Sequence, residues 1–177
     1  PEGDIYYSDV AGVTFLEAID FGISDLTNIH CLDNLEELML NWNEITDIGP
    51  LSELTNLSIL YLGYWGSDLS DISPLSTLIN LTELYIVAAQ LSDIDPLSSL
   101  TGLVSLSLGS NQISDISPLS NLTGLDWLHL GTNEISDISA LETLTNLTTL
   151  ALAHNQINDI SPLVDNVGID KGDYLVI

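Results

Sequence analysis

The chain has 177 residues, of which 45% are hydrophobic, so it is long enough for one ordinary domain with a sizeable core. Its formal net charge is −25, because 26 acidic residues face a single basic one. Binding to nucleic acid or to anionic lipid depends on clustered lysine and arginine, so this charge excludes both classes of partner. The sequence also lacks an apolar run long enough to span a membrane.

Residues 1–9 form a short N-terminal lead-in segment before any repeat begins. They contain no starting methionine and no signal peptide, and the chain stops at Ile177 shortly after a new strand-like segment starts. We therefore expect a piece of a longer protein. Cys31 is the single cysteine, so no disulfide forms within the chain.

A 22-residue pattern then repeats seven times, from Val10 to Asp165. The copies cover residues 10–31, 32–53, 54–77, 78–99, 100–121, 122–143 and 144–165, and the third copy carries two extra residues. A fixed period with apolar residues at set places predicts a solenoid, in which each unit buries its face against its neighbours. The seventh and ninth positions alternate with other residues, as in Leu106 and Leu108, which predicts a short strand with one buried face. Adjacent copies should pair in parallel.

Two features follow each strand. Position twelve is asparagine at Asn43, Asn111, Asn133 and Asn155. A buried amide there should bond the backbone of neighbouring copies, and we expect a looser stack at Phe21, in the third copy and at Ala89, where the column is interrupted. The return path contains Ser-Pro-Leu, which predicts a single short helical turn.

The strand pattern Leu-x-x-Leu-x-x-Leu-x-Leu and the return Asn-x-Ile-x-Asp-Ile-x-Pro-Leu resemble bacterial leucine-rich repeats of the internalin class over about nine tenths of the chain. The resemblance implies an α/β solenoid: a right-handed superhelix with a concave parallel β-sheet and short 3-10 turns on the convex side. It also implies display outside the cell or on its surface. Residues 166–177 resemble the start of the exit loop and strand that follow such arrays. Internalins carry a helical N-terminal cap, which residues 1–9 do not supply. A cytosolic relative of the phosphatase-regulator kind is a second possibility, against which the recurrent Pro-Leu argues.

Aromatic residues occupy outward positions beside the strands, where the core gives them no role. The candidate partner-binding residues are Trp42, Tyr61, Tyr64, Trp65, Tyr85, Glu37, Glu44, Glu83, Trp127 and His129. Exposed rings rimmed by polar residues are typical of interaction surfaces. Trp42, Tyr61, Tyr64, Trp65 and Tyr85 come from three consecutive copies and should form one patch bordered by the three glutamates. The alternative is that the rings stack laterally and cover the stretch where the asparagine column is broken.

An aspartate recurs on the return path of every copy: Asp25, Asp47, Asp71, Asp93, Asp115, Asp137 and Asp159. The favoured interpretation is that each carboxylate accepts a hydrogen bond from the amide two residues on, forming an Asx turn. The alternative is calcium bridging between copies, because carboxylates at this spacing suit a hard cation. Apart from this alternative, the sequence predicts no cofactor and no metal site.

The sequence contains neither a nucleophile elbow nor a glycine-rich phosphate loop, so an enzyme is the least favoured class. We expect a monomeric, non-catalytic recognition module that binds a protein partner, a basic one given the bordering glutamates, in adhesion or another cell-surface interaction. A carbohydrate-binding module that uses the same rings is the first alternative. A structural spacer in a larger secreted protein is the second.

Overall fold

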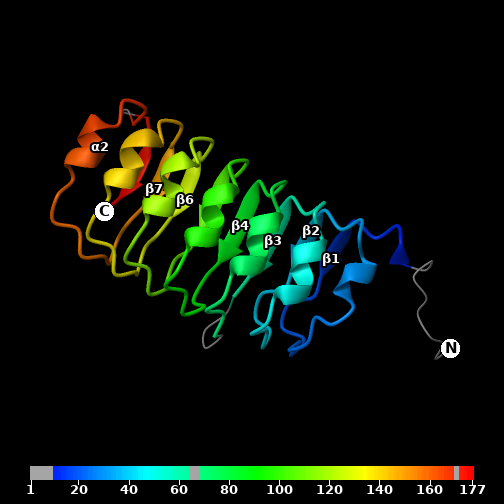
Figure 1. The fold of residues 1–177 in the computed structure, drawn as a ribbon. Helices are drawn as coiled ribbons and strands as arrows, with labels where there is room; N and C mark the ends of the chain where they lie inside the picture. Colours follow the sequence, from blue (N-terminus) through cyan, green and yellow to red (C-terminus); the bar gives the residue numbers. More distant parts are fainter. Residues whose placement is uncertain (1–9, 64–67, 170–171) are drawn as a thin grey trace.

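The computed structural model describes residues 10–63, 68–169 and 172–177. Strands lie along one face of an elongated stack, and short helices lie along the opposite face (Figure 1). The strands are β1 (Phe15–Glu17), β2 (Glu37–Met39), β3 (Ile59–Leu62), β4 (Glu83–Ile86), β5 (Ser105–Ser107), β6 (Trp127–His129), β7 (Thr149–Ala151) and β8 (Tyr174–Val176). The helices are η1 (Ile29–Cys31), η2 (Gly49–Glu53), η3 (Ser73–Thr77), η4 (Asp95–Ser99), η5 (Ser117–Asn121), η6 (Ser139–Thr143) and α2 (Ser161–Asp165).

The strands form one parallel sheet in the order in which they occur along the chain. Each residue of a strand lies beside the residue at the same repeat position in the next strand, as Leu38 lies beside Leu60 and Leu60 beside Leu84. The two extra residues of the third copy leave this register intact, since Tyr61 still faces Tyr85. The predicted solenoid with a parallel sheet and 3-10 turns is confirmed, with a short α-helix, α2, as the last turn.

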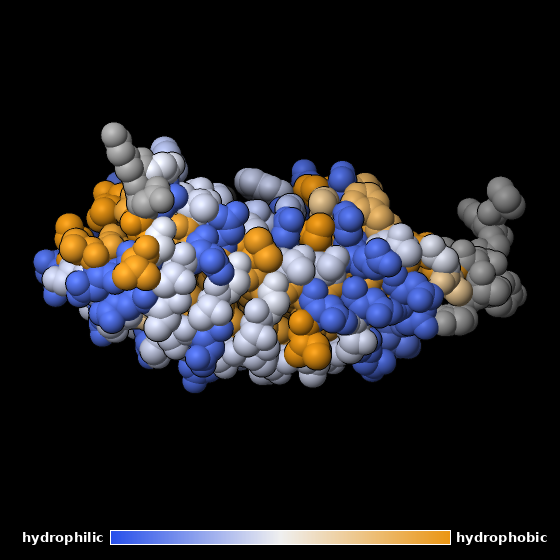
Figure 2. Space-filling model, turned by 90° about the horizontal axis from the view of Figure 1, so that it is seen from above, coloured by the Kyte–Doolittle hydropathy of each residue, from blue (hydrophilic) through white to orange (hydrophobic). Residues whose placement is uncertain are grey.

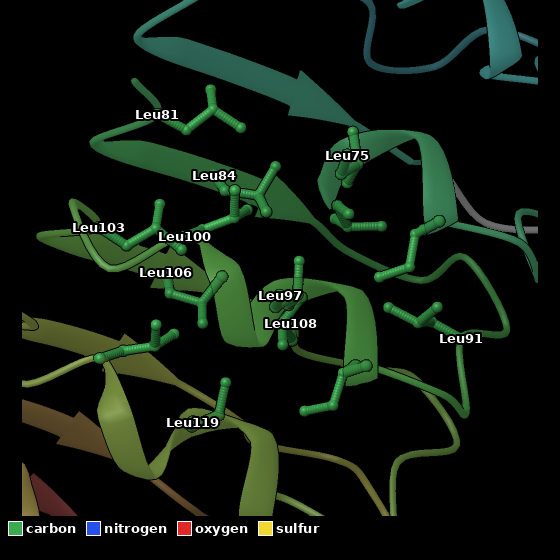
Figure 3. Close-up of a cluster of buried hydrophobic side chains, with 14 of the residues drawn as sticks. Leu75, Leu81, Leu84, Leu91, Leu97, Leu100, Leu103, Leu106, Leu108 and Leu119 are labelled. Atoms are coloured by element: carbon green, nitrogen blue, oxygen red, sulfur yellow. The ribbon is translucent and has the colours of Figure 1, made fainter. Parts of the chain in front are cut away.

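Leucine fills the space between the sheet and the 3-10 helices. Figure 3 shows Leu84 and Leu106, from adjacent strands, on one side of this layer and Leu97, from η4, on the other. All three side chains are fully buried. On the helical side of this layer, proline occupies the first turn of η2 to η5 and of α2. Its fixed φ favours the start of a helix at these positions.

The C-terminal end of the stack leaves apolar side chains uncovered. Figure 2 shows hydrophobic residues gathered at the end that carries α2 and β8. Val164 and Val167 are 77% and 89% exposed there, and Ile160 and Ile177 are also exposed. The described residues therefore bury the interior of the solenoid better than its end.

Where the column holds asparagine, its side chain satisfies the backbone of the bend, as predicted. Oδ1 of Asn111 accepts hydrogen bonds from the N–H groups of Ala89 (3.0 Å) and Leu91 (3.1 Å) in the preceding copy. Its Nδ2 donates to the carbonyl oxygens of Ile86 (2.8 Å) and Leu108 (2.9 Å). Asn43 serves the interrupted position at Phe21 in the same way, so each amide completes the turn of the copy before it.

The recurrent aspartates form Asx turns, which confirms the favoured interpretation. In all seven copies the N–H two residues on donates to the aspartate Oδ1, at 2.7–2.9 Å. At Asp115, the hydrogen bond from the Ser117 N–H, followed by that from its hydroxyl, lowers the pKa of the carboxyl. The ionised carboxylate is therefore the form that the turn prefers.

Among the described residues, no helix combines the length and the apolar character that crossing a membrane requires.

Removing one rung of the asparagine column should destabilise the stack. Asn111→Ala leaves buried donors and acceptors unpaired in two copies, so we expect the free energy of unfolding to fall by about 2–3 kcal/mol. The measurement is urea unfolding followed by circular dichroism. Asn158→Ala is the matched control, since the Asn158 amide is exposed and donates to the nearby Gln156 carbonyl. Equal unfolding midpoints for the two variants would contradict this account.

The Asx turn makes a second, pH-dependent prediction. Asp115→Ala should lower Tm at neutral pH more than Asp115→Asn does, because asparagine keeps an acceptor oxygen although it loses the charge that the turn prefers. A lowered folded-state pKa stabilises the fold above the unfolded-state pKa of about 3.9, and this contribution is lost as the pH falls through the folded-state value. The Tm advantage of the wild type over Asp115→Ala should therefore shrink below about pH 4. Calorimetric scans from neutral to acidic pH measure it, and a constant advantage would refute the mechanism.

Candidate functional site

The strand face consists of the residues on either side of the buried leucine in each strand. We use this name for Phe15, Glu37, Ile59, Glu83, Ser105, Trp127 and Thr149 at the sixth repeat position and for Glu17, Met39, Tyr61, Tyr85, Ser107, His129 and Ala151 at the eighth. In β2 to β7 the central leucine is buried. The residues directly before and after it are half-buried, except Ser107 in β5, which is buried. Side chains at these positions therefore face away from the core.

Four ring side chains on this face form an aromatic ladder, which we define as Tyr61, Tyr85, Trp127 and His129. The ring centroids of Tyr61 and Tyr85 lie 4.3 Å apart with an interplanar angle of 50°. Tyr85 stacks on Trp127 at 5.7 Å, and Trp127 stacks on His129 at 6.0 Å. The ladder spans β3 to β6, which is longer than any one copy of the repeat.

Small residues on β5 allow the ladder to cross that strand. Ser105 lies beside Trp127 in the sheet register, and Ser107 lies beside Tyr85 and His129. The Tyr85 and Ser105 hydroxyls are 2.8 Å apart and share a hydrogen bond. Because serine occupies both positions, the Trp127 ring reaches over β5 to the ring of Tyr85.

The His129 ring packs against two glycines that have no side chain to obstruct it. A side-chain Cβ at Gly109 would collide with the imidazole ring, and one at Gly131 would lie 3.2 Å from Nε2. The Ser107 hydroxyl lies 3.4 Å from Nδ1 of the same ring. Burial lowers the pKa of His129, so its imidazole is neutral at pH 7.

The ladder itself carries no charge at neutral pH, but carboxylates lie beside it. Loss of solvent, the neighbouring Tyr85 and the nearby Glu83 raise the pKa of Tyr61 to about 12. The protonated Tyr61 hydroxyl donates to Oε2 of Glu83 at 3.3 Å. Glu37 is likewise half-buried on the strand face. The part of the chain that the structure describes contains no lysine or arginine to neutralise these carboxylates.

Trp42 follows β2 and lies just beyond the strand face. Its side chain is 53% exposed and its φ is 63°, in the left-handed region. Trp42 and Tyr85 line the same hollow, which has a volume of about 150 Å³ and is also bounded by Asn41, Leu62, Gly63, Val87 and Ala88. Glu44, two residues further on, is exposed.

Three rings of the patch that the sequence predicted lie in the described residues, and they come together. Tyr61 and Tyr85 are in contact, Trp42 joins Tyr85 through the hollow, and Tyr64 and Trp65 lie outside the described residues. The rings of the ladder do stack laterally, and they extend toward Trp127 and His129. Sequence reasoning missed the contributions of Ser105, Ser107, Gly109, Gly131 and Asn41. The sequence signal that could have revealed the serines and glycines is that small residues occupy repeat positions at which other copies hold larger side chains.

The aspartate column is not arranged as a metal site. Each Oδ1 already accepts a backbone N–H within its own turn. Within residues 10–63, 68–169 and 172–177, no three side chains of His, Cys, Asp or Glu are grouped so that they could hold a metal ion.

The family model described as leucine-rich repeats in two copies matches residues 33–77, 79–121 and 123–165. Among solved structures, an internalin (InlF) from Listeria monocytogenes is 41% identical with a TM-score of 0.90, and the match covers 97% of this chain and 49% of the internalin. This chain therefore spans about half the length of that relative. Internalin C2 from Listeria monocytogenes is 31% identical with a TM-score of 0.80, covering 98% of this chain and 83% of the internalin.

A leucine-rich-repeat protein from Leptospira interrogans shares the fold at 24% identity, with a TM-score of 0.72 over 84% of this chain and 38% of its own length. None of the curated proteins matches the chain significantly. The repeat model covers most of the chain, and the identity with both Listeria proteins exceeds 30%. The chain therefore belongs to the leucine-rich-repeat family, and within it to the internalin-like class.

Proposed function

We propose that this chain is a non-catalytic recognition module that binds a protein partner through its strand face, in adhesion or another interaction at the cell surface. Leucine-rich-repeat solenoids generally serve as protein-interaction modules, and their curved sheets provide extended binding surfaces. The observation that carries the proposal is the aromatic ladder on β3 to β6. Extracellular location comes with the internalin-like class and is part of the proposal.

The ladder supports binding because the core does not require it. The strand interior is leucine or isoleucine in every described copy, and the rings lie on the opposite side. Tyrosine and tryptophan are the residues most enriched where binding energy concentrates in protein interfaces. Stacking among the rings fixes their positions before a partner arrives, which reduces the entropy lost on binding.

The stacking also favours a protein over a carbohydrate as the partner. A sugar binds on the free flat face of a ring. In the ladder, the faces of Tyr85, Trp127 and His129 are turned toward one another, with interplanar angles of 28° in both pairs. Ring edges and polar neighbours remain for contact, and these suit the irregular side-chain surface of a protein.

The charge of the chain favours a basic partner. A net charge of −25 attracts cationic surfaces over long range, and Glu37 and Glu83 place two carboxylates on the strand face itself. Complementary charge of this kind raises the association rate and selects against acidic partners.

Replacing one rung of the ladder should weaken recognition without unfolding the chain. The experiment screens the protein against arrays of cell-surface proteins and glycans, and then compares the wild type with Trp127→Ala. We expect a protein hit whose Kd rises about 30-fold or more, because central aromatic anchors contribute about 2 kcal/mol or more. Ile79→Ala is the matched control, since Ile79 is an exposed apolar residue (62%) outside the strand face. A hit that both variants retain equally would refute the proposed surface.

Salt dependence separates the two classes of partner. A basic protein should bind more weakly as sodium chloride rises from about 0.05 M to 0.5 M, because screening shortens the reach of the glutamates. Binding of a neutral glycan by ring stacking would change little over the same range. Titration calorimetry at both salt concentrations measures the difference, and a salt-insensitive protein hit would exclude the electrostatic part of the proposal.

A further inference from the structure

The hollow beside the ladder combines two rings with an amide. Trp42 from the segment after β2 and Tyr85 from β4 contribute aromatic walls, and Asn41 lines the same hollow. The volume of about 150 Å³ is well below that of pockets for whole small molecules. The hollow therefore suits a single side chain.

Asn41 contributes an unsatisfied acceptor. Its Oδ1 is buried and accepts no hydrogen bond from the described part of the chain. A buried acceptor without a partner is costly, so native proteins rarely keep one without a reason. Rotation about the Cβ–Cγ bond of asparagine is soft, so a small turn of the amide would aim Oδ1 at a donor seated in the hollow that Asn41 lines.

We propose that this hollow receives a lysine or arginine side chain of the protein partner. The cation would lie against the ring of Trp42, beside Tyr85, and donate an N–H to Oδ1 of Asn41. Arginine is the better fit, because its planar group stacks on aromatic rings while its edge donates hydrogen bonds. The inference rests on the proposed function and specifies the chemistry of its partner.

The surroundings of the hollow favour a cation over other donors. A hydroxyl or an amide would satisfy Asn41 but would gain little from the face of the Trp42 ring. The net charge of −25 further stabilises a positive group at the surface and opposes an anion. A hydrophobic side chain would fill the volume but would leave Oδ1 unpaired.

The test is an NMR titration of the 15N-labelled chain with N-acetyl-arginine-N-methylamide. The comparison compound is N-acetyl-citrulline-N-methylamide, which has nearly the same shape but carries a neutral urea group. We expect saturable shifts at the Asn41 side-chain amide, the Trp42 indole and the Ala88 amide with the arginine compound. The citrulline compound should bind at least about tenfold more weakly.

Two variants tie the signal to the hollow. Trp42→Asn removes the ring, and asparagine tolerates the positive φ at this position, so the backbone should be retained. Asn41→Ala removes the acceptor. Both variants should abolish saturation with the arginine compound while keeping the amide spectrum of a folded chain, whereas Ile79→Ala, at an exposed residue outside the strand face, should leave the titration unchanged.

The inference is overturned if both compounds bind equally, if the shifts spread over the acidic surface away from the hollow, or if Trp42→Asn still saturates. Its failure is distinguishable from that of the proposed function. A partner whose binding is lost in Trp127→Ala but unchanged in Trp42→Asn would retain the strand face as the binding surface and remove the hollow from it.

Discussion

The whole structure depends on one constraint, the register that sets each residue beside its counterpart one copy away. The strand pairs hold this register from β1 to β8, and the third copy keeps it despite its two extra residues. Because of it, identical residues form columns. Leucine columns make a continuous core, asparagine columns satisfy the bends, and aspartates close each return turn. No copy could keep these contacts alone, so the stability of each depends on its neighbours.

The sequence predicted what the columns determine. Leu106 and Leu108, Asn111 and Asp115 each hold the position and the contacts that their place in the repeat implied. The repeat pattern does not predict a contact that depends on the size of the side chains in the strand between two residues. Trp127 reaches Tyr85 only because β5 offers serine at both outward positions, and a pattern of 22 residues does not encode the direction in which a ring leans. Asn41 was missed for the same reason, since its unpaired oxygen depends on three-dimensional packing.

The residues at the bend show how the fold leaves room for function. Trp42, Ser110, Thr132 and His154 occupy the eleventh position of their copies, and all have φ near +60°. Glycine and asparagine adopt this conformation at least cost, so the backbone of the bend does not itself favour a tryptophan there. Its side chain is half exposed and lines the hollow beside Tyr85. In our proposal this ring is part of the surface that contacts the partner.

The carboxylates and the aromatic rings of this surface act over different distances, and both kinds of interaction serve recognition. The carboxylates act over roughly a Debye length of 8 Å or more and attract any cationic surface, so they set the rate of encounter rather than its specificity. The ladder and the hollow act only on contact, and neither contains a carboxylate, a lysine or an arginine. Neutral groups set in a strongly acidic surface allow a basic partner to approach quickly and to be discriminated by shape once it arrives. The repeat makes this arrangement possible, since outward positions vary from copy to copy while the leucine, asparagine and aspartate columns preserve the fold.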